Sequence, residues 1–401
     1  MRAVHQCQRC LYTTEHPFGL TLDAEGICSG CRTHEEKTRL DWSARAALLP
    51  KRVSSILGRR KARDYDCVVP VRGTPEHFKV LDLVINGLGL RPLVVAYNSQ
   101  FNSVAGIENF DRLRDTFDVD LIHYTSNPRV YKKLVRESLV RLGSMRWPYL
   151  AGATQFPVQV AVERSILLVI WPLHQPTEQT GVHSYMEEPE MSRRGRHEFD
   201  LMRHEPADLV TVESLVQPVE VEDLHYPTEQ TLSRSGVRGL YLANYHPWDS
   251  RRYSEEMIER FGARAALNRR TFDSYDRIDD CTYMTVHDLL KFARLGYSRV
   301  TDSLCREIRF GRVSRADARA IELHFQAEQA QAEVEQFCAW LGMKPDALDW
   351  FHRHLHTLHP AVAGAVRLTE AQQTFVAGFK TNAPPVWTTP NYVVFGKGLR
   401  I

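Results

Sequence analysis

Four cysteines near the start of the chain place the strongest constraint on how it can fold. Cys7 and Cys10 form one Cys-x-x-Cys pair and Cys28 and Cys31 form a second, with seventeen residues between the pairs. Two residues between thiolates allow one tight turn to aim both sulfurs at a single tetrahedral ion. The spacing is typical of paired zinc knuckles and predicts a Zn²⁺ site with four thiolate ligands.

The segment around these pairs is predicted to be a small folded module. Gly30 gives the second knuckle its backbone freedom, and residues 20–26 have the pattern of a short hairpin. Four thiolates leave no open coordination position, so the ion is expected to hold structure rather than to activate water. This donor set favours zinc over an iron–sulfur cluster. Reduced cysteines or a redox pair remain the alternative.

Composition and charge narrow the class of protein. The chain has 401 residues, of which 43% are apolar and 25% charged, with a formal net charge of +2. This length suggests two or three folding units, and the near-neutral charge gives no support to a nucleic-acid partner. No run of 18 apolar residues occurs, and the first ten residues lack the apolar core of a signal peptide. We therefore expect a soluble, cytoplasmic protein.

Apolar runs alternate with helical patterns through the middle of the chain. The predicted strands are 65–71, 93–97, 119–124, 166–171 and 240–243, and the predicted helices between them are 75–88, 103–117 and 129–142. Strands that alternate with helices of about a dozen residues predict an α/β fold with a parallel sheet covered on both faces.

The rest of the chain is predicted to be helical. Residues 34–62 suggest a helical connector, and the later helices are expected at 255–260, 286–292, 302–310, 315–329, 333–341 and 346–355, followed by an extended tail from residue 383. The predicted organisation is a zinc-knuckle module (1–35), a connector (36–62), an α/β domain (63–250) and a helical C-terminal region with its tail (251–401).

The loop after the first predicted strand is a candidate for anion binding. Thr74 is a plausible N-cap and Pro75 suits the first turn of the next helix. Gly73 would let an anion approach backbone amides at the positive end of that helix. An ordinary turn from strand to helix is the alternative.

The order of these elements resembles the N-acetyl sugar amidotransferases of the PP-loop ATP pyrophosphatase superfamily. The similarity spans residues 7–355 and includes the stretches "YDCVVPV", "RPLVVAYNSQFNS", "NYHPW" and "FDSYDRIDDCTY". A family pattern of Gly-x-x-Arg-x-Thr-Asp followed by Ile-Arg-x-Gly is matched by Gly296, Arg299, Thr301, Asp302, Ile308, Arg309 and Gly311.

The resemblance implies a PP-loop, adenine nucleotide alpha hydrolase-like fold and a role in surface-glycan biosynthesis, including lipopolysaccharide and pseudaminic acid. ATP with Mg²⁺ would activate an acetamido or carboxyl group of a sugar or sugar nucleotide, and ammonia from a glutaminase partner would then displace AMP. The nucleotide loop would comprise Arg72, Gly73, Thr74, Glu76 and His77. The family's Ser-Gly-Gly-Lys-Asp-Ser is altered here: Pro75 takes the lysine position and His77 that of the second serine, so the loop is degenerate.

Other polar residues are candidates for the substrate site. His246 and Trp248 follow the last predicted strand, where an imidazole and an aromatic ring suit a sugar or adenine. Asp276, Asp279, Asp280 and Tyr283 are expected on a polar loop that could ligate Mg²⁺ or bind hydroxyl groups. Arg299, Asp302 and Arg309 match the family pattern, with a buried ion network as the alternative.

The polar stretch 173–205 contains several histidines and glutamates without a compelling ligand spacing. It is predicted to be a solvated or mobile loop, from which Arg193, Arg194 and Arg196 could meet an anionic sugar or nucleotide.

Three functions follow from these observations. The first is an amidotransferase-like enzyme of the PP-loop type. The second is a PP-loop homologue that has lost its ATP chemistry and serves as a binding or scaffold subunit. The third is tRNA thiolation, because some PP-loop thiolases also begin with zinc knuckles, although the near-neutral charge argues against it.

Overall fold

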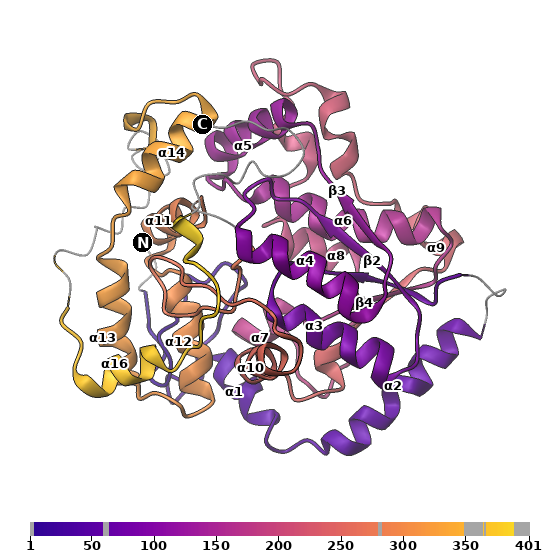
Figure 1. Ribbon diagram of the computed structural model, residues 1–401, viewed down its shortest axis with the longest axis horizontal. Coiled ribbons are helices and arrows are strands. Elements are labelled where there is room, and N and C mark those ends of the chain that lie inside the picture. The colour runs from indigo at the N-terminus through magenta and orange to yellow at the C-terminus, as the bar shows by residue number, and fades with distance from the viewer. Residues whose placement is uncertain (1–3, 59–63, 280–282, 349–363, 365, 389–401) are drawn as a thin grey trace.

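A five-stranded parallel sheet organises the middle of the chain (Figure 1). The computed structural model describes residues 4–58, 64–279, 283–348, 364 and 366–388. The strands are β1 (Cys67–Pro70), β2 (Pro92–Tyr97), β3 (Leu121–Tyr124), β4 (Leu168–Trp171) and β5 (Arg238–Tyr241), in the spatial order β3-β2-β1-β4-β5. Every neighbouring pair is parallel. The predicted α/β class and the five predicted strands are therefore confirmed.

Helices cover both faces of the sheet. Val69 and Val94 belong to the core on one face, which is covered by α2 (Trp42–Leu57), α3 (Pro75–Leu81), α4 (Val104–Phe117) and α10 (Ser250–Phe261). Val68 and Val95 point to the other face and pack against α6 (Trp147–Glu163). Adjacent residues of a strand point to opposite faces, so burial on both sides requires nearly continuous apolar strands.

The helices that follow the strands begin at recognisable caps. The Ser103 side chain accepts a hydrogen bond from the amide of Gly106 at the start of α4. Asn127 accepts from Arg129 at the start of α5 (Pro128–Leu142). Both are side-chain caps that satisfy otherwise unpaired amides of the first turn. The helix α3 continues as a π-helical turn, η1 (Asp82–Gly87).

Helix α6 is absent from the predicted elements. Its sequence contains Pro148, Gly152 and Pro157, residues that disfavour helix interiors. Pro148 stands in the first turn, where the missing amide is not needed. Gly152 permits close packing, because a methyl group there would overlap the ring of Tyr97. Burial against the sheet outweighs the low helix propensity of this segment.

The segment between β4 and β5 corrects the predicted solvated loop at 173–205. It folds into α7 (Gln175–Thr180), α8 (Arg193–Gly195), π-helical η2 (Arg196–Asp200), 3-10 helices η3 (Pro206–Leu209) and η4 (Pro218–Leu224), and α9 (Glu229–Ser235). Arg196 is buried and donates to the carbonyl oxygens of Ala151 and Leu224. Polar composition misled the prediction, because these polar groups find partners within the protein.

The C-terminal region is helical, as predicted. Its elements are α11 (Tyr283–Leu295), α12 (Arg299–Arg309), α13 (Arg315–Gln326), α14 (Gln331–Leu341), the unpredicted α16 (Glu370–Ala377) and the 3-10 turn η6 (Val386–Thr388). Most of the helix predicted at 346–355 and the tail beyond residue 388 lie outside the described residues. The beginning of the tail packs on the protein, with Val386 donating to the carbonyl oxygen of Leu267.

The strand order places a topological switch point between β1 and β4. The chain runs from β1 outward to β2 and β3, whereas β5 lies beyond β4 on the opposite side. In open parallel sheets, ligands bind outside the carboxyl ends of the strands at such a point. Among the helices that the structure describes, none combines the length and apolar character needed to span a membrane.

Candidate functional site

The four N-terminal cysteines come together as the pair spacing predicts. Their sulfur atoms all lie within 4.8 Å of one another, and all four residues are buried. The amides of Cys10 and Cys28 donate to the sulfur of Cys7, at 3.4 and 3.2 Å. Hydrogen bonds from Cys10 and Cys31 lower the pKa of the Cys28 thiol to about 6. Four buried sulfurs this close together fit a metal ion such as zinc.

The cysteine module docks on the C-terminal helices. Its residues share a buried cluster with Tyr297, Leu304 and other side chains of the C-terminal region. Helix α1 (Ser29–Glu36) starts at the second knuckle and packs beside α7. A fifth cysteine, Cys305 on α12, accepts the amide of Leu11 at 3.4 Å. The cysteine module is therefore part of the wall around the region described next, to which it contributes Tyr12.

Two neighbouring cavities lie where β1, β4 and β5 end. The first, here called the arginine cavity, is lined by four arginines together with side chains of α7 and Trp248. The second, the serine cavity, is lined by Ser250, Ser254 and Ser303 among others. The two share Ser250, Asp276 and Arg306. They occupy the switch point that the strand order marks.

One face of helix α12 supplies most of the charge in the arginine cavity. Arg299, Asp302, Arg306 and Arg309 all line it. Residues spaced by three, four and three positions lie on the same side of a helix. The fourth arginine, Arg277, comes from the loop before α11 and has a left-handed backbone with φ of 53°. Such a conformation is uncommon for a residue other than glycine and is concentrated at functional sites.

Several guanidinium groups in this cavity have donors to spare. Among the residues that the structure describes, the acidic oxygen recorded beside Arg277 belongs to Asp276, at 3.8 Å. The Nε atoms of Arg299 and Arg309 are buried and have no hydrogen-bond partner. Such donors are free to meet an acceptor on a ligand.

The electrostatic field here is positive. Burial opposes ionisation of Asp276, but the charges of Arg277 and Arg299, with Arg306 and Arg72, hold the pKa of its carboxyl well below its ordinary value. Burial and then the nearby arginines lower the pKa of Arg277 to about 10, so it remains charged at neutral pH. The pKa of His287 lies well below its usual range through burial and the charge of Arg146 and its neighbours. This environment favours an anion.

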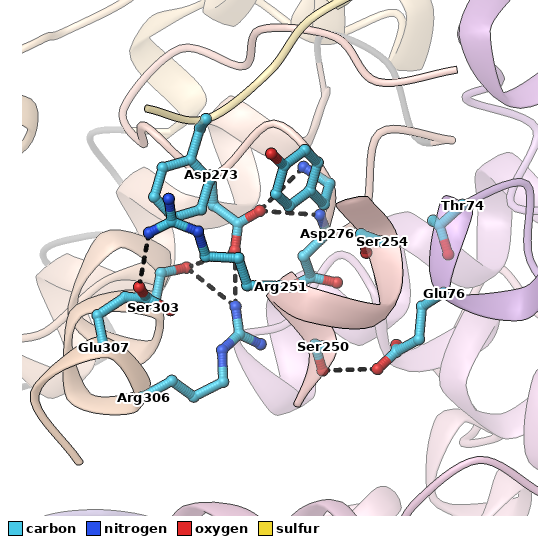
Figure 2. Close-up of a pocket in the computed structure, with 12 residues that line it drawn as sticks. Thr74, Glu76, Ser250, Arg251, Ser254, Asp273, Asp276, Ser303, Arg306 and Glu307 are labelled. Carbon is cyan, nitrogen blue, oxygen red and sulfur yellow. Dashed lines mark hydrogen bonds and ion pairs between the residues drawn. The ribbon is translucent and has the colours of Figure 1, made fainter. Parts of the chain in front are cut away.

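The serine cavity is lined by hydroxyl and carboxyl groups (Figure 2). Figure 2 shows Glu76 on the side of α3 and Arg306 on the side of α12, with Asp273 and Asp276 between them. One oxygen of Glu76 accepts from both the Trp248 indole and the Ser250 hydroxyl, each at 2.6 Å. Burial raises the pKa of Glu76.

The loop 72–77 makes its contacts with the protein itself. Arg72 pairs with the carboxylate of Asp279 through two hydrogen bonds, at 3.0 and 2.6 Å. A methyl group on Gly73 would overlap the carbonyl oxygen of Gly106. Thr74 occupies the predicted N-cap position, but its hydroxyl pairs with the His77 ring at 2.9 Å instead of a backbone amide.

The predicted site residues divide into two groups. Trp248, Arg299, Asp302 and Arg309 line the arginine cavity, and Thr74 and Glu76 line the serine cavity. Arg72, Gly73 and His77 lie beside these cavities without lining either, and His246 is half-buried just after β5. Asp280 is outside the described residues.

The predicted placement of Tyr283 is wrong, and the three arginines of the segment 193–196 lie away from the two cavities. Tyr283 is not on a polar loop: it is buried at the start of α11, where its ring meets Phe101 edge to face with 4.6 Å between centroids. Arg196 has its donors occupied by backbone carbonyls between α6 and η4, and Arg193 and Arg194 line neither of the two cavities.

Sequence reasoning missed Arg277, Arg306 and Tyr12 as lining residues of the arginine cavity. Arg306 had a usable signal, because it lies seven positions after Arg299 and three before Arg309 on one helix face. Arg277 had a weaker signal, because it lies between the candidates Asp276 and Asp279. Tyr12 had none, since it reaches the cavity only through tertiary folding.

Comparison with protein families gives one partial match. Residues 255–359 match the family model of the LPS biosynthesis protein WbpG-like, C-terminal domain. This segment is about a quarter of the chain and contains all four arginines of the arginine cavity. A search of curated proteins finds no match. The chain is therefore similar over this segment to a domain of proteins of LPS biosynthesis.

Proposed function

We propose that this protein acts in the biosynthesis of lipopolysaccharide or a related surface glycan, and that the arginine cavity binds the anionic group of a sugar substrate. The observation that carries the proposal is the set of four arginines around one cavity at the switch point of the sheet. The family match to an LPS biosynthesis domain covers those same arginines.

The spare donors suit a phosphate or a carboxylate. Arginine presents a planar fork of N–H groups that matches both anions through paired hydrogen bonds. Within the described part of the chain, the acidic contact of Arg277 is the 3.8 Å one with Asp276, and Arg299 retains an unpaired buried Nε. The adjoining hydroxyl and carboxyl groups of the serine cavity would serve the hydroxyls of the sugar. An anionic sugar would then lie across the wall that the two cavities share.

The reaction that we propose for this substrate is amidotransfer on a PP-loop scaffold. An amide oxygen is a poor leaving group, and transfer of an adenylyl group from ATP, with release of pyrophosphate, would make it a good one. Ammonia from a glutaminase partner would then displace AMP. The parallel sheet, the loop 72–77 beside the serine cavity and the cysteine module are the features that support this proposal.

A second candidate is a binding subunit without ATP chemistry. The contacts of the loop favour it: Arg72 is paired with Asp279, and the carbonyl oxygen of Gly106 lies against Gly73, where a phosphate would need donors. Pro75 has no backbone N–H to offer. In this case the sugar ligand would bind as proposed, while nucleotide activation would belong to another protein.

Titration calorimetry tests the anion site. We expect the zinc-loaded protein to bind inorganic pyrophosphate, and UDP-N-acetylglucosamine as a sugar-bearing probe. The variant Arg277→Gln should bind both about tenfold more weakly, because one charge-assisted pair is lost. Arg252→Gln, at an exposed arginine of α10, is the matched control and should bind normally. Equal binding by the Arg277 variant and wild type, or no binding by either, would overturn the proposal.

Titration with ATP and Mg²⁺ separates the two candidates. Binding by the wild type, alone or with a glutaminase subunit, supports amidotransfer on this chain. No binding in either case supports the subunit without ATP chemistry. The double change Pro75→Lys and His77→Ser should then confer affinity for ATP only if the pocket around the loop can still accept phosphate.

A further inference from the structure

The cysteine module holds one wall of the arginine cavity in place. Helix α7 lines that cavity with Gln175, Glu178 and Gln179, and it packs beside α1 of the module. The contact is close: a methyl group on Gly30, inside the second knuckle, would overlap the carbonyl oxygen of Gln179. The hydroxyl of Ser29 also donates to the carbonyl oxygen of Thr180 at 2.5 Å.

Arg309 joins the module, helix α7 and the cavity. Its two terminal nitrogens donate to the carbonyl oxygens of Glu178 at 2.7 Å and Gln179 at 2.8 Å. The second of these nitrogens also lies 3.8 Å from the sulfur of Cys28. Its guanidinium carbon sits 5.5 Å from the ring centre of Tyr12, which lines the same cavity. The remaining nitrogen, Nε, is buried and without a partner.

Through these contacts, the charge of a metal-bound cysteine cluster would attract the guanidinium group of Arg309. A Zn²⁺ ion with four thiolates carries a net negative charge, and a terminal nitrogen of Arg309 lies 3.8 Å from one of those sulfurs. With the ion bound, the sulfur of Cys28 is a charged acceptor for the guanidinium, and the knuckle that presses on α7 is fixed. Without the ion, the knuckle loses its tetrahedral constraint. The carbonyl oxygens of α7 and the side chain of Arg309 are then no longer held in position.

We propose that metal binding at the cysteine cluster controls ligand affinity at the arginine cavity, with Arg309 as the positioning residue that couples them. This inference rests on the proposed function, since it requires that the cavity bind an anion. Coupling between two sites is reciprocal. An anion in the cavity should therefore slow loss of the metal, just as the metal strengthens binding of the anion.

The rate of zinc transfer to a chromophoric chelator measures this coupling. We expect saturating pyrophosphate to slow transfer from wild type about tenfold, within the usual range for coupled sites. Arg309→Lys keeps the charge but cannot span two carbonyl oxygens and a sulfur. Its zinc release should not respond to pyrophosphate. Protection that persists in this variant, or no protection in wild type that binds pyrophosphate, would overturn the proposal.

Arg315→Lys is the matched control for the chelator experiment. Arg315 also touches the module, donating to the carbonyl oxygen of Cys10 at 3.2 Å, but it does not line the arginine cavity. Its zinc release should remain sensitive to pyrophosphate. Calorimetry on the same zinc-loaded wild type separates the two proposals. If pyrophosphate binds without affecting zinc release, only the coupling fails; if it does not bind, the proposed function and the coupling both fail.

Discussion

Gly73 and Gly106 allow three backbone segments to meet beneath the site. A methyl group on Gly73 would overlap the carbonyl oxygen of Gly106, and one on Gly106 would overlap the backbone of Asp279. The side-chain amide of Asn109 stabilises this arrangement by donating to the carbonyl oxygens of Gly73 and Arg264, at 3.0 Å each. The position of the loop 72–77 therefore depends on close packing that only glycine permits.

We predict that Gly73→Ala lowers the free energy of unfolding by about 1–3 kcal/mol, because the added methyl group must push backbone apart. Urea denaturation followed by circular dichroism measures the change. Gly87→Ala is the control: the nearest atom to an added methyl group there is 4.0 Å away. Its effect should stay within about 0.5 kcal/mol. Equal losses in the two variants would contradict the packing account.

The His77 ring is buried and neutral. Burial, assisted by the charge of Arg72, lowers its pKa from 6.5 to about 3. When folding lowers the pKa of a histidine, its contribution to the stability of the native state is fully present at pH values above the pKa that the histidine has in the unfolded chain. That contribution declines as the pH falls from 6.5 towards 3, because the unfolded state then binds a proton that the native state does not.

We predict that His77→Gln makes the protein less sensitive to acid. The difference between the free energies of unfolding, wild type minus variant, should decrease by about 2 kcal/mol when the pH is lowered from 7 to 5. Urea titrations of both proteins at the two pH values measure this difference, in which effects common to both proteins cancel. His5→Gln, at an exposed histidine, should show no such trend. A constant difference between wild type and the His77 variant would contradict a neutral, buried ring.

At the scale of elements, α12 shows how a helix can be predicted while its role is only partly recognised. The sequence predicted a helix at 302–310, and the structure begins it at Arg299. One face carries charged groups into the arginine cavity, whereas Val300 and Leu304 pack into the cluster that includes the knuckles. The sequence periodicity of the segment predicts both the charged face and the apolar face of this helix. What each face meets depends on the rest of the fold.

Helix α1 begins at the cysteine cluster, which supplies its N-cap. Its N-cap is Cys28, whose sulfur accepts the amide of Cys31 at 3.4 Å. We predict that Cys28→Ser reduces the zinc content below about one ion per chain and lowers the free energy of unfolding by at least about 3 kcal/mol. Mass spectrometry of metals and urea denaturation measure the two effects. Cys338→Ser, at a buried cysteine outside the cluster, should keep its zinc. Full zinc in the Cys28 variant would contradict the four-cysteine site.

Two elements mark the limit of prediction from local pattern. Helix α6 was missed because proline and glycine lower its intrinsic helix propensity, while its stability comes from burial against β1 and β2. The segment 173–205 was mistaken for a solvated loop because its polar groups suggested exposure. Arg196 instead stacks on Tyr226, with 4.8 Å from its guanidinium carbon to the ring centre, and satisfies its donors internally.

At the scale of the whole molecule, the parallel sheet was predictable because its central strands are apolar on both faces. Val68, Val69, Val94 and Val95 are all fully buried, and that demand is visible in sequence as continuous apolar runs. The cysteine cluster was predictable because its ligands are local pairs. The division of the chain into module, connector, α/β domain and helical region remains a prediction.

The arginine cavity could be predicted only in part. Its walls come from segments that are far apart in the chain, including Tyr12, α7, Trp248, Arg277 and α12. The sequence marked Arg299, Asp302 and Arg309 through a family pattern. It gave no means of placing them opposite α7 or beside the knuckles, because those neighbours are set by the strand order and by the docking of the cysteine module.

The most direct test of this account is where an anion binds. Crystals of the zinc-loaded protein can be soaked in tungstate and examined for anomalous density from tungsten. We predict a peak within hydrogen-bonding distance of Arg277 and Arg299 in the arginine cavity. A peak at the backbone amides of residues 72–77, with no anion among the arginines, would contradict the central claim.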